Sequence, residues 1–294
     1  MPEKHRLRSY PINLQALPQA TTSRILIIDS GVGGLSVFQH ICRKIGNCEL
    51  FYCADNAGFP YGTKRESALN LHLEKLVAKL ASKTEPDIVV IACNTASTTA
   101  LEIIRQTLHK PVIGVVPAIK PAAEMTSGTI GILATSVTIA SAYTDNLIKE
   151  WASHCEVKKI ACDALVQIAE KKIANREIDH DNLKRALDAA LGIAGAIDNA
   201  GRTTAIDTMV LACTHFPIVQ TELESCMPFV KHWVDSGEAI ARRVSSVLES
   251  NHLPFDTSKD NRCEFIYTRQ TGYYEKISDS LKNFGFSKFS FIEP

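Results

Sequence analysis

The chain has 294 residues, enough for one or two domains at roughly 150 residues each. Its 32 Lys and Arg residues balance its 32 Asp and Glu residues, and this zero net charge argues against a nucleic-acid-binding surface or a polybasic membrane anchor. Hydrophobic residues make up 45% and charged residues 22%, which is typical of a soluble globular protein and excludes a disordered chain.

The nine cysteines do not suggest a disulfide framework. Their number is odd, no two form a Cys-x-x-Cys pair, and residues 1–24 lack the apolar segment of a signal peptide. No apolar run approaches the roughly 18 residues that a membrane-spanning helix needs. The sequence therefore predicts a cytoplasmic protein whose cysteines stay reduced.

Residues 1–23 contain three prolines and little periodicity, and we expect a loosely ordered extension there. Beyond them, short β-rich segments alternate with helical patterns. The predicted strands are Arg24–Asp29, Cys48–Cys53, Asp87–Ala92, Val112–Val116, Thr129–Ala134, Val157–Ala161, Thr208–Ala212, Val230–Val234 and Phe265–Thr268. The clearest predicted helices are Arg65–Ser82, Asp181–Asp198 and Gly237–Glu249. Such alternation indicates parallel sheets joined by crossover helices.

Two pairs of segments resemble each other. Asp87–Thr98 and Asp207–Val219 both run from an aspartate through an apolar strand to Ala-Cys and a polar pair. Arg24–Gly31 and Thr129–Val137 are both strands that end in small polar residues. The fold class predicted from this is α/β, with two similar parallel-sheet domains related by pseudo-two-fold symmetry and an active site in the cleft between them.

The boundaries that follow are an N-terminal extension at 1–23, a first domain of 24–117 plus 231–294, and a second domain of 118–230. Ligands of open parallel sheets bind beyond the carboxyl ends of the strands. The polar residues after the repeated strands are therefore the candidates for chemistry.

Each repeated segment carries a cysteine, Cys93 or Cys213, between a strand and a helical pattern. Free backbone N–H groups at a helix N-terminus can offset much of the roughly 2 kcal/mol that ionising a thiol costs at neutral pH. Two facing thiols suit a redox disulfide, a soft-metal site or acid/base chemistry from opposite faces. A redox disulfide usually has Cys-x-x-Cys spacing, which is absent here. A metal site built from Cys93, Cys213 and His215 would need a fourth ligand, and the sequence offers no obvious one. The near-symmetry favours the third, because inverting a tetrahedral carbon needs a base on one face and an acid on the other.

Four motifs occur in the order and approximate spacing of one known family: Asp29-Ser30-Gly31 with Gly33-Gly34, Pro60-Tyr61-Gly62, Cys93-Asn94-Thr95, and Cys213-Thr214-His215 with Pro217. In these motifs the chain resembles the glutamate racemases of the aspartate/glutamate racemase superfamily. The resemblance runs from about Arg24 to at least Arg243.

The resemblance implies cofactor-independent interconversion of L- and D-glutamate, which supplies D-glutamate for peptidoglycan. It implies that Cys93 takes the α-proton from D-glutamate and that Cys213 takes it from L-glutamate. By the same resemblance, Asp29 assists Cys93, and His215 and Glu170 assist Cys213. Glu170 lies in a segment that departs from the family's usual proline-containing version. The implied substrate-binding residues are Asp29, Ser30, Tyr61, Gly62, Asn94, Thr95, Thr135, Thr214 and His215.

The resemblance also bears on partners. Many family members are homodimers, and some, typically those with a similar N-terminal extension, require UDP-N-acetylmuramoyl-L-alanine as an activator, so residues 1–23 suggest the same partner here. No metal, nucleic acid or membrane is implied. The alternatives are another superfamily activity (an aspartate racemase, a hydantoin racemase or a maleate isomerase), a binding module without catalysis, and a thiol redox protein.

Overall fold

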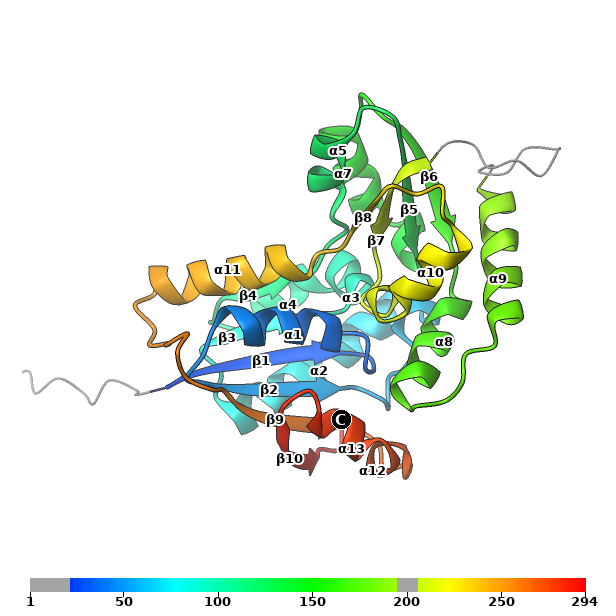
Figure 1. Cartoon of the computed structure of the whole chain (residues 1–294). Helices are drawn as coiled ribbons and strands as arrows, with labels where there is room; N and C mark the ends of the chain where they lie inside the picture. The colour runs from blue at the N-terminus through cyan, green and yellow to red at the C-terminus, as the bar shows by residue number, and fades with distance from the viewer. Residues whose placement is uncertain (1–21, 195–205) are drawn as a thin grey trace, which may run out of the picture.

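The computed structural model describes residues 22–194 and 206–294, and within them the strands form two parallel sheets (Figure 1). The six-stranded sheet has the order β10-β9-β2-β1-β3-β4, and the four-stranded sheet has the order β6-β5-β7-β8. The strands of the first sheet are β1 (Ser23–Asp29), β2 (Cys48–Ala54), β3 (Ile88–Ile91), β4 (Val112–Gly114), β9 (Arg262–Tyr267) and β10 (Phe286–Phe291). Those of the second are β5 (Thr129–Ala134), β6 (Glu156–Ala161), β7 (Ile206–Leu211) and β8 (His232–Val234).

The two sheets repeat one arrangement of strands. The run β2-β1-β3-β4 in the first sheet has the same order as β6-β5-β7-β8 in the second. In this alignment β1 corresponds to β5 and β3 corresponds to β7, which are the two pairs that the sequence similarity predicts. The predicted α/β fold with two parallel-sheet halves is confirmed.

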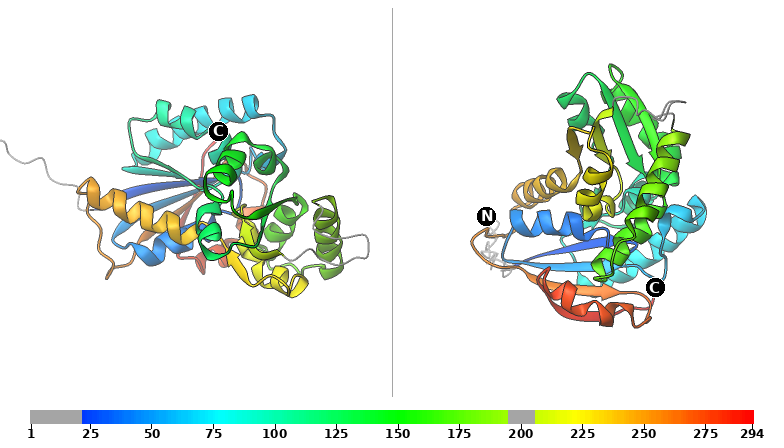
Figure 2. Two further views of the ribbon diagram at one scale, coloured as in Figure 1. Left: turned by 90° about the horizontal axis from the view of Figure 1, so that it is seen from above. Right: turned by 45° about the vertical axis from the view of Figure 1, so that its right-hand side comes forward.

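Helices cover both faces of each sheet (Figures 1 and 2). On the six-stranded sheet, one core packs under α1 (Leu35–Lys44), α11 (Gly237–Ser250), α12 (Tyr273–Lys276) and α13 (Ser278–Lys282), and the other under α2 (Glu66–Thr84), α3 (Asn94–Thr99) and α4 (Leu101–Thr107). On the four-stranded sheet, the cores pack under α8 (Ala164–Ile173), α9 (His180–Ile193), η2 (Phe216–Val219) and α10 (Gln220–Cys226), and under α5 (Ile119–Met125), α6 (Ser136–Ala140) and α7 (Ala142–Trp151). A short turn, η1 (Tyr61–Thr63), follows β2 and contacts α6.

Strand β1 shows why the apolar runs predict buried strands. Ile25 and Ile27 point into the core beneath α1 and α11, whereas Leu26 and Ile28 point into the core beneath α2. All four side chains are at most 1% exposed. A strand covered on both faces needs apolar side chains at every position, so its sequence is a continuous run of apolar residues.

All nine predicted strands are present, with ends that move by no more than three residues. The predicted helix Arg65–Ser82 is α2, and Gly237–Glu249 is α11. The predicted helix Asp181–Asp198 begins as α9, but its last residues, 195–198, lie outside the described part of the chain. Strand β10 is an addition that the sequence analysis missed.

The domain boundaries remain a prediction. Strand β8, on the far side of the predicted boundary at 230/231, pairs with β7 in the four-stranded sheet. The predicted extension at 1–23 lies outside the described residues up to residue 21, and Ser23 begins β1. No helix in the described part of the chain is long and apolar enough to cross a membrane.

Candidate active site

The two predicted thiols occupy matching positions in the two sheets. Cys93 follows the last residue of β3 by two positions, and Cys213 follows the last residue of β7 by two positions. Both side chains are almost buried, at 8% and 7% exposure. Since β3 and β7 correspond in the repeated strand order, the fold presents one thiol from the carboxyl end of each sheet.

Asp29, the last residue of β1, is fully buried beside Cys93 and raises the pKa of that thiol. Its Oδ1 accepts a hydrogen bond from the backbone N–H of Gly31 at 3.0 Å, and its Oδ2 accepts one from the Thr214 hydroxyl at 3.0 Å. Thr214 directly follows Cys213 in the other sheet's domain, so this contact crosses between the domains. Burial raises the pKa of Asp29, against the lowering effects of His215 and of these two donors.

On the opposite side, His215 lies next to Cys213. Its Nδ1 is 3.9 Å from Sγ of Cys213, and its Nε2 is 2.9 Å from Oε1 of Glu170. Burial lowers the pKa of His215, but the contacts with Cys213 and Glu170 raise it well above its ordinary value. Glu170, on helix α8, therefore contacts the imidazole despite its unusual local sequence, and its role in assisting Cys213 stays a prediction.

The setting of the Cys93 thiol corrects one expectation. Cys93 caps helix α3, and backbone N–H groups of Ala96 and Thr95 do lower its pKa. Burial outweighs them, however, and together with the Asp29 charge it raises the pKa of Cys93 well above the ordinary range. At Cys213 no α-helix begins at all, because the turn η2 starts three residues later. The helix N-terminus does not therefore decide the ionisation of Cys93.

The glycine-rich loop after β1 is explained by close approach of the His215–Glu170 pair. A Cβ added to Gly33 would lie 2.3 Å from Nδ1 of His215, and one added to Gly31 would lie 2.3 Å from Oε1 of Glu170. Both distances are far below van der Waals contact. The backbone N–H of Val32, between the two glycines, donates to Oε1 of Glu170 at 2.9 Å. The loop of Gly31, Val32 and Gly33 therefore packs directly against these two side chains.

Three threonines predicted or found near Cys93 form a buried hydroxyl cluster. Oγ1 of Thr95 is 3.1 Å from Oγ1 of Thr135 and 3.3 Å from that of Thr138. Thr138 was not predicted. A Cβ on Gly62 would lie 3.2 Å from Cβ of Thr135, so this glycine packs directly on the cluster. Three predicted binding residues, Gly62, Thr95 and Thr135, are thus brought together from three separate segments of the chain.

Asn94 offers a free acceptor next to Cys93. Its side chain is 3% exposed, and its Oδ1 has no hydrogen-bond partner among residues 22–194 and 206–294. It lines, with Cys213 and Thr214, a cavity of about 10 Å³, which is room for about one water molecule. A buried amide oxygen without a donor costs free energy unless a bound group supplies the missing hydrogen bond.

Tyr61 and Ser30 are placed differently from the other predicted binding residues. The Tyr61 hydroxyl donates to Oδ2 of Asp55 at 2.7 Å and is buried. The Ser30 hydroxyl lies 3.4 Å from its neighbour's carboxylate, Oδ1 of Asp29. Asp55 was missed by the sequence analysis, although it follows the end of β2 directly and so had the same signal as the residues that were found.

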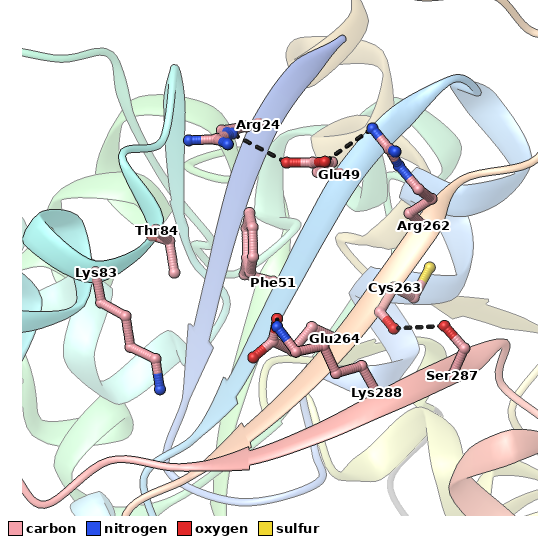
Figure 3. Close-up of a pocket in the computed structure, with 10 residues that line it drawn as sticks. All are labelled: Arg24, Glu49, Phe51, Lys83, Thr84, Arg262, Cys263, Glu264, Ser287 and Lys288. Atoms are coloured by element: carbon pink, nitrogen blue, oxygen red, sulfur yellow. Dashed lines mark hydrogen bonds and ion pairs between the residues drawn. The ribbon is translucent and has the colours of Figure 1, made fainter.

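A larger cavity, of about 470 Å³, lies at the amino-terminal part of the six-stranded sheet (Figure 3). Of its charged side chains, all but Lys83 form ion pairs with one another, and Lys83 lies 3.4 Å from the Phe291 carbonyl oxygen. Glu49 accepts from Arg24 at 2.9 Å and from Arg262 at 2.8 Å, while Lys288 is 2.7 Å from Glu264. Since the thiols stand at the carboxyl ends of the strands, this cavity is remote from them, and none of the four motifs contributes to it.

Fold and site together define a two-domain α/β protein that presents two thiols from corresponding strand ends, each beside a different titratable side chain. Residues 25–244 match the Asp/Glu/Hydantoin racemase family. A "Glutamate racemase" of Histophilus somni is 41% identical over 238 residues, covering 81% of this chain and 85% of that protein. One of Haemophilus influenzae (strain PittGG) is 40% identical, covering 92% and 96%.

Among solved structures, Escherichia coli glutamate racemase, in complex with L-glutamate and the activator UDP-MurNAc-ala, superposes with a TM-score of 0.82 at 35% identity, covering 92% of this chain and 98% of that one. Isoform RacE1 from Bacillus anthracis gives a TM-score of 0.75 at 26% identity, covering 94% and 98%. The chain belongs to the Asp/Glu/hydantoin racemase family and, within it, to the glutamate racemases. It is an isomerase.

Proposed function

We propose that the enzyme interconverts L- and D-glutamate without a cofactor, by proton transfer between the substrate's α-carbon and two thiols. One observation carries this proposal: Cys93 and Cys213 stand at equivalent strand ends of two repeated sheets, beside different partners. Opposed thiols can serve the two faces of one carbon, as a racemisation requires.

Cys93 and Cys213 differ in the titratable groups that surround them. The raised pKa of Cys93 keeps that thiol protonated, ready to act as an acid. The raised pKa of His215 keeps the imidazole protonated, with its Nδ1 beside the sulfur of Cys213. In the proposed reaction Cys213 takes the proton from L-glutamate, and Cys93 delivers one to the opposite face of the α-carbon. In the reverse direction the two thiols exchange these roles, with Asp29 and His215 as their partners.

The polar residues around the thiols fit the rest of the substrate. The free Oδ1 of Asn94 accepts a hydrogen bond from the substrate's ammonium group. Hydroxyls of Thr95, Thr135 and Thr214, with Ser30 and the backbone near Tyr61 and Gly62, hold the two carboxylates. Proton loss from the α-carbon builds negative charge on the adjacent carboxylate, so donors fixed in advance at that position stabilise the transition state.

The test is proton NMR of L-glutamate incubated with the pure protein in D2O, with no cofactor added. We expect the α-proton signal to disappear while D-glutamate accumulates. L-Aspartate serves as the matched substrate control and should exchange far more slowly. An unchanged glutamate signal, in both the presence and absence of activator, would contradict the proposal.

The second arm of this experiment adds UDP-N-acetylmuramoyl-L-alanine. The E. coli relative binds such an activator, and we propose the same dependence here. Exchange that begins only when the precursor is present would establish it. Supply of D-glutamate for peptidoglycan, a cytoplasmic location and a homodimer remain predictions, as does the absence of nucleic-acid partners.

A further inference from the structure

The carboxylate of Glu170 has hydrogen-bond partners besides His215. Its Oε1 accepts from Val32 N–H at 2.9 Å and lies 2.9 Å from Nε2 of His215. Its Oε2 accepts from the Tyr273 hydroxyl at 3.1 Å, and that hydroxyl is also 3.1 Å from the backbone carbonyl oxygen of Glu170. The two carboxylate oxygens therefore have different partners: Oε1 contacts the imidazole and Oε2 contacts the phenol.

Tyr273 reaches this site from a part of the chain far from the four motifs. It begins helix α12, after β9, beyond the residues 25–244 that match the family. Its ring meets that of Tyr274 edge-on, with centroids 5.1 Å apart, and Tyr274 is 3% exposed in the core of the six-stranded sheet. Glu170, on α8, belongs to the four-stranded sheet's domain. The Tyr273–Glu170 bond therefore joins a rigid anchor in one domain to a side chain of the other.

The hydroxyl is suited to donate to a carboxylate. Burial, followed by the Glu170 charge, raises the pKa of Tyr273, so the phenol keeps its proton. With Oε2 held in this way, Oε1 stays directed at Nε2 of His215. A carboxylate at Nε2 takes the hydrogen bond from that nitrogen and fixes the ring so that Nδ1 faces Sγ of Cys213.

We propose that Tyr273 is a positioning residue for the Cys213 half of the reaction: its hydroxyl holds Glu170, and Glu170 holds His215 against the thiol. This proposal rests on the two-thiol function proposed above. The Cys93 half does not use Tyr273, because Asp29 accepts its hydrogen bonds from Gly31 and Thr214. Loss of the hydroxyl should therefore slow proton transfer at one thiol and leave transfer at the other unchanged.

Tyr273→Phe tests this inference, with Tyr267→Phe as the matched control. Tyr267 belongs to the same aromatic cluster, but its hydroxyl is directed at Glu275, at 3.4 Å, and not at Glu170. We expect kcat/KM of Tyr273→Phe to fall about 5- to 10-fold, as for loss of one hydrogen bond to a charged group, and that of the control to stay unchanged. The effect is moderate because a cavity of about 300 Å³ beside Glu170 and Tyr273 can admit water to the vacated position.

Isotope effects show which thiol is affected. L- and D-glutamate have equal free energies, so kcat/KM must fall equally in the two directions, but the slow step differs. If transfer at Cys213 is slowed, deuterium at the substrate α-carbon should retard L-glutamate more than in the wild type. For D-glutamate it is the solvent isotope effect that should rise, because Cys213 then delivers the proton. Equal changes for both enantiomers, or none, would overturn the proposal.

A double variant separates positioning from general destabilisation. If Tyr273 acts through Glu170, adding Tyr273→Phe to Glu170→Gln should reduce kcat/KM no further than Glu170→Gln alone does. A full additional 5- to 10-fold loss would overturn the proposal. Wild-type protein that fails to exchange the α-proton would instead contradict the proposed function itself, so the two failures are distinguishable.

Discussion

At the level of single residues, the two thiols differ in their surroundings although they share a position in the fold. Cys93→Ser and Cys213→Ser should each lower racemisation by at least about 10²-fold, because a serine hydroxyl is too weakly acidic to exchange the proton. Steady-state rates on both enantiomers measure this. Cys226→Ser, which changes a partly exposed cysteine of helix α10, should keep wild-type activity. Full activity in either active-site variant would contradict the two-thiol proposal.

The contact between Gly33 and His215 leads to a second prediction at this level. Gly33→Ala places a Cβ 2.3 Å from the imidazole Nδ1, so the ring must leave its present position beside Cys213. A displacement of about 1 Å at a reacting group can cost about 10²-fold, and we expect kcat/KM to fall about 10- to 100-fold. Urea unfolding, measured alongside, reports any loss of stability.

Gly192→Ala is the matched control for that variant. A Cβ there meets no atom within 4 Å, and alanine is the better helix former in α9. Its activity should equal that of the wild type, with a free energy of unfolding that is equal or higher. If Gly33→Ala were as active as Gly192→Ala, the imidazole would not need the position that the structure gives it.

At the level of elements, buried strands could be predicted and an edge strand could not. Strand β3 is buried along its whole length and reads as an unbroken apolar run. Strand β10 lies at the sheet's edge with most of its residues partly or fully exposed, so Ser287, Lys288 and Ser290 interrupt its apolar pattern. The hydrophobic pattern of a sequence reflects burial, so a strand cannot be predicted from that pattern where its side chains are only partly buried.

The same distinction holds for the site. Cys93 and Cys213 could be found because short motifs follow apolar strands and repeat. Asp55 could have been found by that rule, since it follows β2. Tyr273 could not, because its contact with Glu170 depends on how the C-terminal segment packs under the sheet, over 100 residues away in sequence. Tertiary packing brings such residues together without leaving a local pattern.

Asp55 carries a prediction for the loop between β2 and α2. Its buried carboxylate accepts hydrogen bonds from Tyr61 and Thr268, each at 2.7 Å, and pairs with His72. Burial raises the pKa of Asp55, but these contacts together lower it below its ordinary value. The carboxylate therefore stabilises the fold above its unfolded-state pKa, and that contribution is lost as the pH falls through the lower folded-state pKa.

Asp55→Asn should accordingly destabilise the protein at about pH 7 by about 2–3 kcal/mol, and the difference from wild type should shrink as the pH falls below about 4. Urea unfolding at a series of pH values measures it. Asp279→Asn, which changes an exposed carboxylate on α13, should show little effect at any pH. A destabilisation by Asp55→Asn that is constant with pH would show that the charge is not what stabilises the loop.

At the level of the whole molecule, the site is assembled by contacts that cross between the two domains. Thr214 reaches Asp29, and Val32 and Tyr273 reach Glu170. The hydroxyl of Ser36, on α1, lies 2.9 Å from the backbone carbonyl oxygen of Thr214. These contacts fix how the two domains, and with them the two thiols, are placed relative to each other.

Ser36→Ala removes one of these interdomain contacts, together with the same hydroxyl's 2.9 Å contact to the Gly33 carbonyl, without changing a thiol, Asp29 or His215. The loss of a hydrogen bond worth about 1 kcal/mol should loosen the contact between the domains, and substrate binding must then provide the free energy that holds them together. We expect KM for L-glutamate to rise about 2- to 5-fold while kcat changes less than about 2-fold, measured in steady-state assays. Ser278→Ala, which removes an exposed hydroxyl at the start of α13, should change neither constant. A fall in kcat at constant KM would mean that Ser36 acts on the proton transfer itself and not on the contact between the domains.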